Sequence, residues 1–203
     1  MTSNFYPSRM NRGQCLAVAL LSCVASSCAD TAAQREAQSR IQPTYDAGSG
    51  RLTKLDYDAN KNGKADSWAY MDGTRLIRLE ADENEDGKID RWEYYPAVAP
   101  GAPGGAAAQP SPERIERATR LDGQISRREF FAGSEMVRVE EDTDANGATD
   151  KWETYADGAL TVLALDTSGT GKPDRRLIYS ADGSLDYIEA DATGSGIFQR
   201  VKP

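Results

Sequence analysis

Hydrophobic positions recur along this chain with a period of about 24 residues. Six aliphatic residues, Leu55, Leu79, Ile115, Val139, Leu163 and Ile188, each precede a marker site by three residues. The markers, numbered position 1 of units 1 to 6, are Asp58, Asp82, Ala118, Asp142, Asp166 and Asp191. Position 6 is glycine in every unit: Gly63, Gly87, Gly123, Gly147, Gly171 and Gly196. A fixed period of this kind predicts an array of small units that stack on their neighbours.

The residues after each glycine favour β-structure. Position 11 carries all three tryptophans, Trp68, Trp92 and Trp152, and position 14 is Met71, Tyr95, Phe131, Tyr155 or Tyr179. Asp-Gly pairs at residues 72–73, 157–158 and 182–183 lie between such runs, which is a strong signal for a tight β-hairpin turn. Each unit is therefore predicted as strand, glycine-containing loop, strand and tight turn. The expected fold is all-β, an array of about six 24-residue hairpin repeats.

Two segments depart from the repeat. Residues 96–112 are rich in Pro, Ala and Gly and lengthen the interval between units 2 and 3, so they are predicted as an insertion. Residues 29–44 are polar and predicted as a tether, which leaves 45–203 as the repeat domain. The stretch 45–53, with its Tyr-Asp and Gly-Arg-Leu, resembles the YD repeats of RHS-type bacterial surface proteins.

The glycine loops carry the chemistry. They resemble EF-hand calcium loops, in which positions 1, 3 and 5 supply side-chain oxygens, position 7 a carbonyl, position 9 a further contact and position 12 a glutamate. Units 2 and 4 match this pattern fully, with Asp82, Asn84, Asp86, Lys88, Asp90 and Glu93, and with Asp142, Asp144, Asn146, Ala148, Asp150 and Glu153. Ca²⁺ takes six to eight oxygen ligands, and alternate residues of a tight loop can present them together.

The remaining units match less completely. Units 1 and 5 keep ligand types at positions 1, 3, 5 and 9 but lack the final glutamate: Asp58, Asn60, Asn62 and Asp66, and Asp166, Ser168, Thr170 and Asp174. Unit 3 has Ala118 and Arg120 where the first two ligands should be, so it is predicted to be a metal-free turn. Unit 6 lacks acids at positions 9 and 12. We expect calcium affinity to fall with the number of carboxylates.

The residues on either side of the loops distinguish a helical EF-hand from a β-hairpin repeat. An EF-hand places a helix on each side of its loop, and a 24-residue period leaves only 12 residues for both helices and their connection. A helical EF-hand-like domain is therefore the alternative rather than the expected fold. Aspartate at position 9 accompanies aspartate at position 1 in four units, whereas Glu129 occupies position 12 in a unit without the first ligands. The hypothesis is that position 9 binds directly and that Glu93 and Glu153 close a site only if the following strand turns inward.

The beginning of the chain is typical of an exported protein. Arg9 and Arg12 precede an apolar run from Cys15 to Ala25, which indicates a signal peptide within residues 1–28. Small residues before Cys28 resemble the lipobox of bacterial lipoproteins, in which that cysteine is lipidated. Cys23 is the competing site, and a plainly secreted chain is a further alternative. The expected location is periplasmic, outer-membrane or cell-surface, with membrane contact through the lipid anchor only.

Composition narrows the function. The chain has no histidine and a net charge of −8, and its three cysteines lie within the first 28 residues. Histidine-based catalysis and thiol catalysis in the body of the chain are excluded, and an acidic surface disfavours nucleic acid. We expect no enzyme activity and a calcium-binding protein whose metal is mainly structural. The alternatives are a calcium-dependent surface module for carbohydrate or protein, with the Trp and Tyr rows as a sugar platform rather than core, and an EF-hand sensor or buffer.

Overall fold

The computed structural model describes residues 32–97 and 111–201. The predicted signal peptide, both candidate lipidation cysteines and most of the insertion lie outside these residues. The described part contains one helix, α1 (Ala32–Ser39), and thirteen strands. The strands are β1 (Ile41–Tyr45), β2 (Leu52–Tyr57), β3 (Ser67–Asp72), β4 (Arg75–Ala81), β5 (Arg91–Tyr94), β6 (Arg114–Arg117), β7 (Arg127–Ala132), β8 (Glu135–Glu141), β9 (Lys151–Ala156), β10 (Ala159–Leu165), β11 (Arg175–Tyr179), β12 (Leu185–Ala190) and β13 (Gln199–Arg200).

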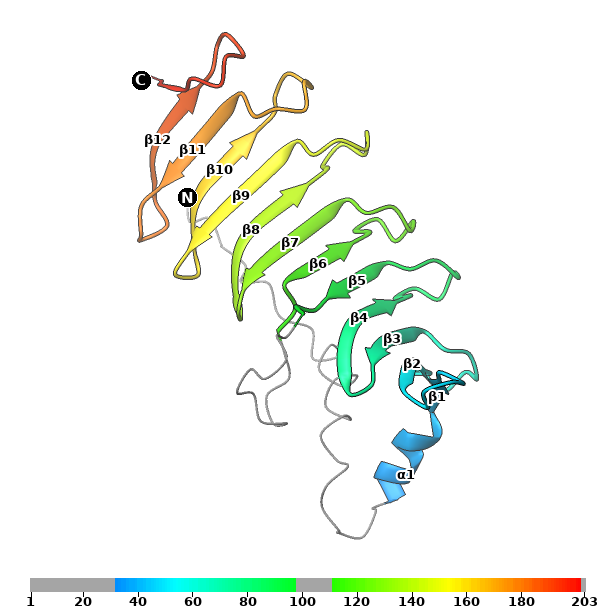
Figure 1. The fold of residues 1–203 in the computed structure, drawn as a ribbon. Coiled ribbons are helices and arrows are strands. Elements are labelled where there is room, and N and C mark those ends of the chain that lie inside the picture. The colour runs from blue at the N-terminus through cyan, green and yellow to red at the C-terminus, as the bar shows by residue number, and fades with distance from the viewer. Residues whose placement is uncertain (1–31, 98–110, 202–203) are drawn as a thin grey trace.

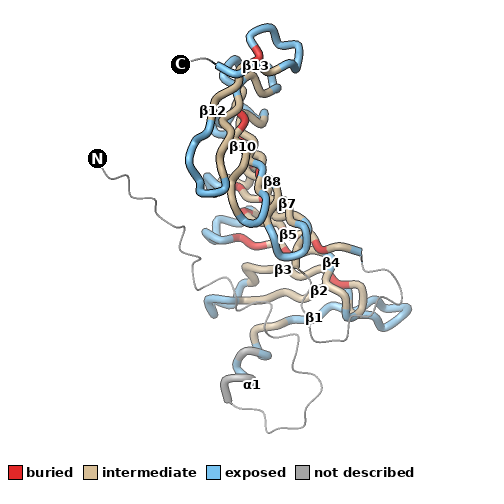
Figure 2. Tube along the Cα trace, turned by 90° about the vertical axis from the view of Figure 1, so that its left-hand side faces the viewer, coloured by how far each residue is buried: buried red, intermediate tan, exposed pale blue. Residues whose placement is uncertain are grey.

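All described strands belong to one sheet. Each strand pairs antiparallel with the next in sequence, so the order across the sheet is simply β1 to β13 (Figure 1). Seen along its edge, the sheet is a single twisted layer (Figure 2). The prediction of an all-β hairpin array is confirmed. In the described ranges, no helix is long and apolar enough to span a membrane.

The connections at the two ends of the strands differ. Short turns lie at one end, together with the β5–β6 connection, most of which is outside the described residues, and six longer loops lie at the other end, which we call the loop edge (Figure 1). We name the longer loops 1 to 6: 58–66, 82–90, 118–126, 142–150, 166–174 and 191–198. An up-and-down meander requires this segregation, because every second connection returns to the same edge. The predicted loop chemistry is thereby gathered along one side of the molecule.

The tight turns follow the Asp-Gly signals. Asp157 and Gly158 join β9 to β10 with φ values of 51° and 75°, and positive φ at both central residues is the hairpin geometry that Asp-Gly favours. Asp72 ends β3 and pairs with Arg75, so Gly73 begins the turn to β4, and the pair at residues 182–183 lies in the turn between the antiparallel strands β11 and β12. The sequence prediction of hairpins at these three sites agrees with the structure.

The segment predicted as a tether contains a helix and a strand. Helix α1 lies within residues 29–44, and strand β1 begins within that range and ends one residue beyond it. Strand β1 pairs with β2 from Ile41↔Tyr57 to Tyr45↔Leu52. Locally this stretch is polar, which is why its sequence indicated a linker. Pairing with the free edge of β2 supplies hydrogen bonds that composition does not reveal, and Pro43 is tolerated because β1 lies at the sheet edge.

Buried apolar side chains are few, because a single layer has no second layer to cover it. Val139 in β8 is fully buried, and Leu79 in β4 is 4% exposed. Leu79 packs with Ala81 and Tyr95, against which Leu76 rests. Cross-strand partners place Leu79 beside Glu93 and place Val139 between Glu129 and Glu153, so aliphatic residues and glutamates alternate in one row across the sheet. The repeating aliphatic position three residues before each marker thus forms the array's apolar seam.

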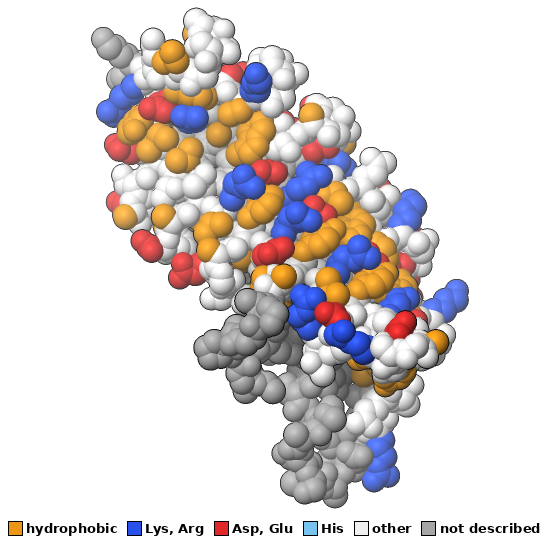
Figure 3. Space-filling model, in the orientation of Figure 1, with side chains coloured by type: hydrophobic (Ala, Val, Ile, Leu, Met, Phe, Trp, Pro, Cys, Tyr) orange, Lys and Arg blue, Asp and Glu red, His pale blue; other side chains and the backbone are white. Residues whose placement is uncertain are grey.

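On the opposite side of the same strands, arginines cover aromatic rings. The guanidinium carbon of Arg78 lies 4.3 Å from the ring centre of Tyr70, and the same arrangement recurs for Arg114 over Tyr94 at 4.2 Å. On the face seen in Figure 3, hydrophobic, basic and acidic side chains are interspersed. Cation–π stacking and long side-chain stems therefore shield rings that a second sheet would otherwise bury.

Candidate metal-binding loops

The six loops share one backbone path. Position 6 glycine has φ between 77° and 89° in every loop, and position 4 is also left-handed throughout, with Glu85 at 63° and Ala145 at 68°. Left-handed φ is costly for residues with a Cβ and easy for glycine, which explains the glycine at position 6. Loop 3 has the same path although it lacks the first ligands. The loop conformation is thus set by the repeat and does not depend on the acidic residues.

The aspartate side chain at position 1 accepts hydrogen bonds from backbone N–H groups of the loop that follows it. In loop 4, Asp142 Oδ1 accepts from the N–H groups of Ala145 and Asn146 at 2.8 and 3.2 Å, and Oδ2 accepts from Gly147 N–H at 2.9 Å. Burial opposes ionisation of Asp142, but these N–H groups and the charge of Arg120 outweigh it and lower its pKa. The carboxylate is therefore ionised and oriented before any ion arrives.

Position 9 closes the loop from the other end. Asp150 Oδ2 accepts from Thr143 N–H at 3.0 Å, and Asp90 Oδ2 accepts from Glu83 N–H at 3.1 Å. In loop 3 the hydroxyl of Ser126 accepts from Thr119 N–H at 3.0 Å, in the same geometry. Position 9 thus holds each of these loops closed. The second oxygen of Asp150 accepts from the Thr143 hydroxyl at 2.7 Å, whereas the second oxygen of Asp90 has no hydrogen-bond partner among the described residues.

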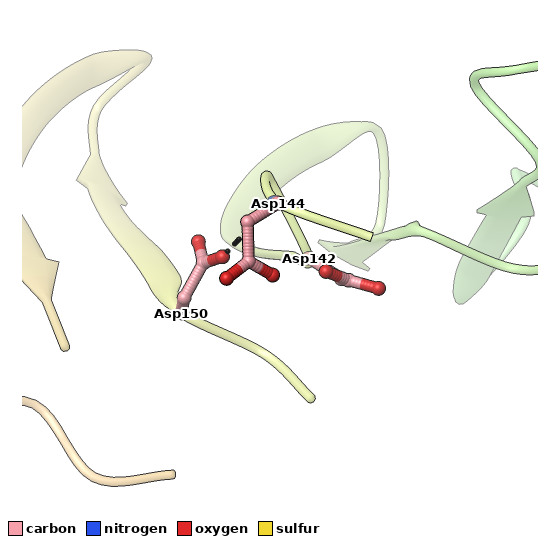
Figure 4. Close-up of side chains that lie close together, drawn as sticks. All are labelled: Asp142, Asp144 and Asp150. Carbon is pink, nitrogen blue, oxygen red and sulfur yellow. Dashed lines mark hydrogen bonds between the residues drawn. The ribbon is translucent and has the colours of Figure 1, made fainter. Parts of the chain in front are cut away.

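Loop 4 brings three carboxylates together. Asp142, Asp144 and Asp150 each place a carboxylate oxygen so that the three atoms lie within 4.8 Å of one another (Figure 4). Asp142 is buried, Asp150 half-buried and Asp144 exposed, so the group is open on the solvent side. Three negative charges at this separation repel one another strongly unless a cation lies between them.

Loop 2 contains two buried acids, one of which, Asp90, is the most deeply buried acid of the described residues. Asp90 is 1% exposed and Asp82 is 8% exposed. Oδ2 of Asp82 accepts from Gly87 N–H at 2.9 Å, while Oδ1 of Asp82 and Oδ1 of Asp90 are buried without a hydrogen-bond partner among the described residues. Burial is the main reason why the pKa of Asp90 is raised, and the charges of Asp86 and Asp82 add to this effect. The backbone N–H groups that donate to Asp90 lower its pKa but do not outweigh burial. Two buried oxygens without donors are costly unless a ligand compensates them.

The glutamates at position 12 point to other partners. Glu93 accepts from Arg91 at 2.5 Å and from the Tyr95 hydroxyl at 2.6 Å, and Glu153 contacts Lys151 at 3.1 Å and accepts from the Tyr155 hydroxyl at 2.8 Å. These groups lie on strands β5 and β9, which continue away from the loops without turning inward. Both carboxylates already bind side chains of the sheet, so the ligand set proposed below does not include them.

The predicted ligands of loops 1 and 5 also form hydrogen bonds within their own loop or to the neighbouring loop. In loop 1, Asp58 accepts from Gly63 N–H at 2.8 Å, while the amides of Asn60 and Asn62 donate to Glu85 of loop 2. In loop 5, Thr167 donates to Asp174, and the pKa of Asp166 is lowered because backbone N–H groups outweigh its burial.

Other predicted ligands bond within or between the loops. Ser168 donates to Asp166, Thr170 approaches the carbonyl of Lys172 at 3.4 Å, and Ala59 N–H donates to Asp66. At position 7, Lys88 N–H and Ala148 N–H donate to the side chains of Asp86 and Asn146. Asn84 accepts from Asp86 N–H and donates to the carbonyl of Leu121 in loop 3.

Contacts between loops were not anticipated from the sequence. Glu85 bridges loop 2 to loop 1, and Arg120 reaches from loop 3 to Asp142 of loop 4. The contact of Arg120 could have been suspected from the sequence, since a cation stands at a ligand position there. The contact of Glu85 could not, because position 4 is not a ligand position and the contact depends on how adjacent loops stack.

The ion pairs around Glu153 predict an acid-dependent stability. Burial opposes ionisation of Glu153, but Tyr155, Lys151 and Arg127 outweigh it and hold its pKa below the ordinary value of 4.5. A lowered pKa stabilises the fold above pH 4.5, and this stabilisation is lost as pH falls through the folded-state value. We expect Glu153→Gln to weaken the decline in melting temperature below pH 4.5. The exposed Glu135→Gln is the matched control, and equal flattening by both variants would contradict the assignment.

Comparison with known proteins adds no functional argument. No protein-family model matches the chain, and no curated protein matches it. A solved structure described as "Crystal Structure of TarM" matches with 11% sequence identity and a TM-score of 0.24, covering 56% of this chain and 17% of that chain. This chain thus spans about a sixth of that structure, and the low TM-score supports no inference about function.

Proposed function

We propose that this chain binds calcium along the loop edge of its sheet, with loops 2 and 4 as the principal sites. The observation that carries the proposal is the pair of buried carboxylate oxygens in loop 2, Oδ1 of Asp82 and Oδ1 of Asp90, which find no donor among the described residues. A hard cation with oxygen ligands is the group that would satisfy both. The trio Asp142, Asp144 and Asp150 in loop 4 supports the same conclusion.

The proposed role of the metal is structural. The sheet has few buried apolar residues, and its loops concentrate negative charge along one edge. Calcium would relieve repulsion within each loop and tie position 1 to position 9, the two ends of a connection between adjacent strands. The exported location and lipid anchor proposed from the N-terminal sequence are consistent with this role, because extracellular modules bind calcium with a dissociation constant of ~10⁻⁴ to 10⁻³ M.

The alternative of a sugar platform finds less support in the aromatic rows. Tyr95 and Tyr155 at position 14 donate their hydroxyls to Glu93 and Glu153. The neighbouring ring of Tyr94 is covered by Arg114. Tyrosine rings that already have partners within the sheet are poor candidates for stacking on a carbohydrate. Trp68 and Trp152 of the other row line hollows beside loops 2 and 5, and the buried loop carboxylates make calcium binding the better supported role.

Two substitutions test the ligand set. Asp90→Asn removes a charge but keeps an oxygen that can accept from Glu83 N–H, so the loop should still close. We expect it to weaken calcium binding at one site by on the order of tenfold or more, because a carboxylate ligand is lost. Glu93→Gln is expected to change calcium affinity by less than about threefold. Isothermal titration calorimetry with calcium measures both.

The exposed Asp186→Asn is the matched control, since it removes the same charge away from the loops. A saturable calcium signal in the unchanged chain that survives Asp90→Asn but is lost in Glu93→Gln would overturn the ligand assignment and favour EF-hand closure. A chain without saturable calcium binding would overturn the proposed function itself.

A further inference from the structure

Loop 3 replaces the first two ligands with residues that cannot bind a cation. Ala118 stands at position 1 and is 2% exposed, and Arg120 stands at position 3. The backbone nevertheless follows the other loops: Ala118 N–H donates to the carbonyl of Asp90 at 2.7 Å, and Gly123 has a φ of 77°. Loop 3 therefore keeps the shape of a calcium loop and carries its own positive charge.

The guanidinium of Arg120 lies between loops 3 and 4. Its Nε is 3.8 Å from Asp122 Oδ2, at position 5 of its own loop, and its Nη2 is 3.7 Å from Asp142 Oδ2, at position 1 of the next loop. Its Nη1 also donates to the backbone carbonyl of Asp142 at 3.4 Å. One side chain thus neutralises a remaining acid of loop 3 and contacts the buried acid of loop 4.

We propose that Arg120 is a built-in cation that takes the place of the metal in loop 3 and lowers the calcium affinity of loop 4. The inference rests on the proposed function, because it concerns the affinity of a site assigned there. Its consequence is that loop 4, despite its three converging carboxylates, binds calcium more weakly than it would without Arg120, because this cation competes for Asp142.

The size of the effect follows from the geometry. An ion bound to Asp142 lies ~2.4 Å beyond its oxygen, which places it within ~6 Å of the guanidinium. Repulsion between a divalent and a monovalent charge at that distance in water corresponds to about a tenfold loss of affinity. The Debye length shortens from ~10 Å at 0.1 M salt to ~3 Å at 1 M, so the effect should shrink as salt rises.

Terbium luminescence isolates loop 4. Trp152 is the second residue of β9, which follows loop 4, and in a Trp68→Phe, Trp92→Phe background it is the sole tryptophan of the chain. Because Trp152 also lies beside Gly171 and Pro173 of loop 5, Asp166→Asn and Asp174→Asn are added to remove the carboxylates of that loop. Excitation of Trp152 then reports Tb³⁺ at loop 4, and displacement by Ca²⁺ gives its calcium affinity. In the full chain, Arg120→Gln is expected to tighten binding about tenfold at low ionic strength, and Arg120→Lys, which keeps the charge, should stay within about threefold of the parent.

Arg138→Gln is the matched control. It removes the same charge from strand β8 of the same hairpin, where Arg138 pairs with Glu140 and is half exposed. An unchanged affinity in Arg120→Gln, or equal tightening in Arg138→Gln, would overturn the role of Arg120 while leaving the calcium-binding function intact. Absence of a terbium signal in the parent chain would overturn both the role of Arg120 and calcium binding at loop 4.

A second readout compares melting temperatures with loop 4 empty and with loop 4 filled. In chelator, Arg120→Gln leaves Asp122 and Asp142 without their shared cation, so its melting temperature should fall below that of the parent. In saturating calcium the difference should narrow or reverse, because the metal now neutralises Asp142 without competition. A variant that melts below the parent by the same margin in both conditions would show a purely packing role and would contradict the proposal.

Discussion

Removing calcium from the full chain is expected to lower its melting temperature by on the order of 10 °C. At ~1 mM calcium and a dissociation constant of ~0.1 mM, each site adds about 1.4 kcal/mol to the free energy of unfolding. Two to four occupied loops would contribute about 3 to 6 kcal/mol, and each kcal/mol shifts the melting temperature of a domain this size by about 2 to 4 °C. The physical source is the loop edge, where Asp142, Asp144 and Asp150 converge and where Asp82 and Asp90 bury unpaired oxygens.

Circular dichroism melts in calcium and in chelator measure this shift. Magnesium at the same concentration is the first control, because it demands octahedral geometry and parts reluctantly with its water. The variant Asp82→Asn, Asp142→Asn is the second, and its response to calcium should be less than half that of the parent. Superimposable melts of the parent in calcium and in chelator would remove the structural role from the proposal.

Shortening Leu79 is expected to be the most damaging single change in the sheet. Leu79 is 4% exposed and packs with Ala81, Tyr95 and Leu76 in the described apolar cluster. Leu79→Ala removes buried methyl groups and leaves a cavity, which costs about 2 to 5 kcal/mol in protein cores. A single-layer sheet has few other apolar contacts with which to compensate, so the loss should appear as a lower urea midpoint.

Ile77→Ala on the same strand is the matched control. Ile77 is 39% exposed, and its truncation should cost less than about 1 kcal/mol. The comparison separates the apolar seam from the general β-propensity of the strand, because both changes replace a branched side chain in β4 by alanine. Equal destabilisation by the two variants would show that the cluster around Leu79 does not act as a core.

Much of the fold could be predicted because its determinants are local. The aliphatic position exemplified by Val139, the glycine exemplified by Gly147 and the Asp157-Gly158 turn each act within a few residues. A period-2 strand, a left-handed loop residue and a two-residue turn need no distant partner to be recognised. Repetition made each signal visible several times, so the hairpins could be placed, whereas the order of the described strands in one sheet came from the structure.

The positions of the proposed ligands could be predicted only in part. Asp142 and Asp150 are oriented by N–H groups of their own loop, so their spacing was sufficient to place them together. Glu153 matched the same motif equally well, but its carboxylate is bonded to Lys151 and Tyr155 on the sheet. The difference arises because the residue after the loop continues a strand, and a strand fixes the direction of its side chains by the pleat.

The sequence by itself therefore determined the repeat, the hairpins, the loop backbone and the acidic residues that face a common point within one loop. Only the tertiary structure decided the contacts between units: β1 added to the first hairpin, arginines laid over the rings of neighbouring strands, Glu85 bridging loops 1 and 2, and Arg120 placed against Asp142. Contacts between units depend on how far adjacent loops stand apart and how the sheet twists. Those distances are set by strand pairing across the whole array, and no 24-residue window contains them.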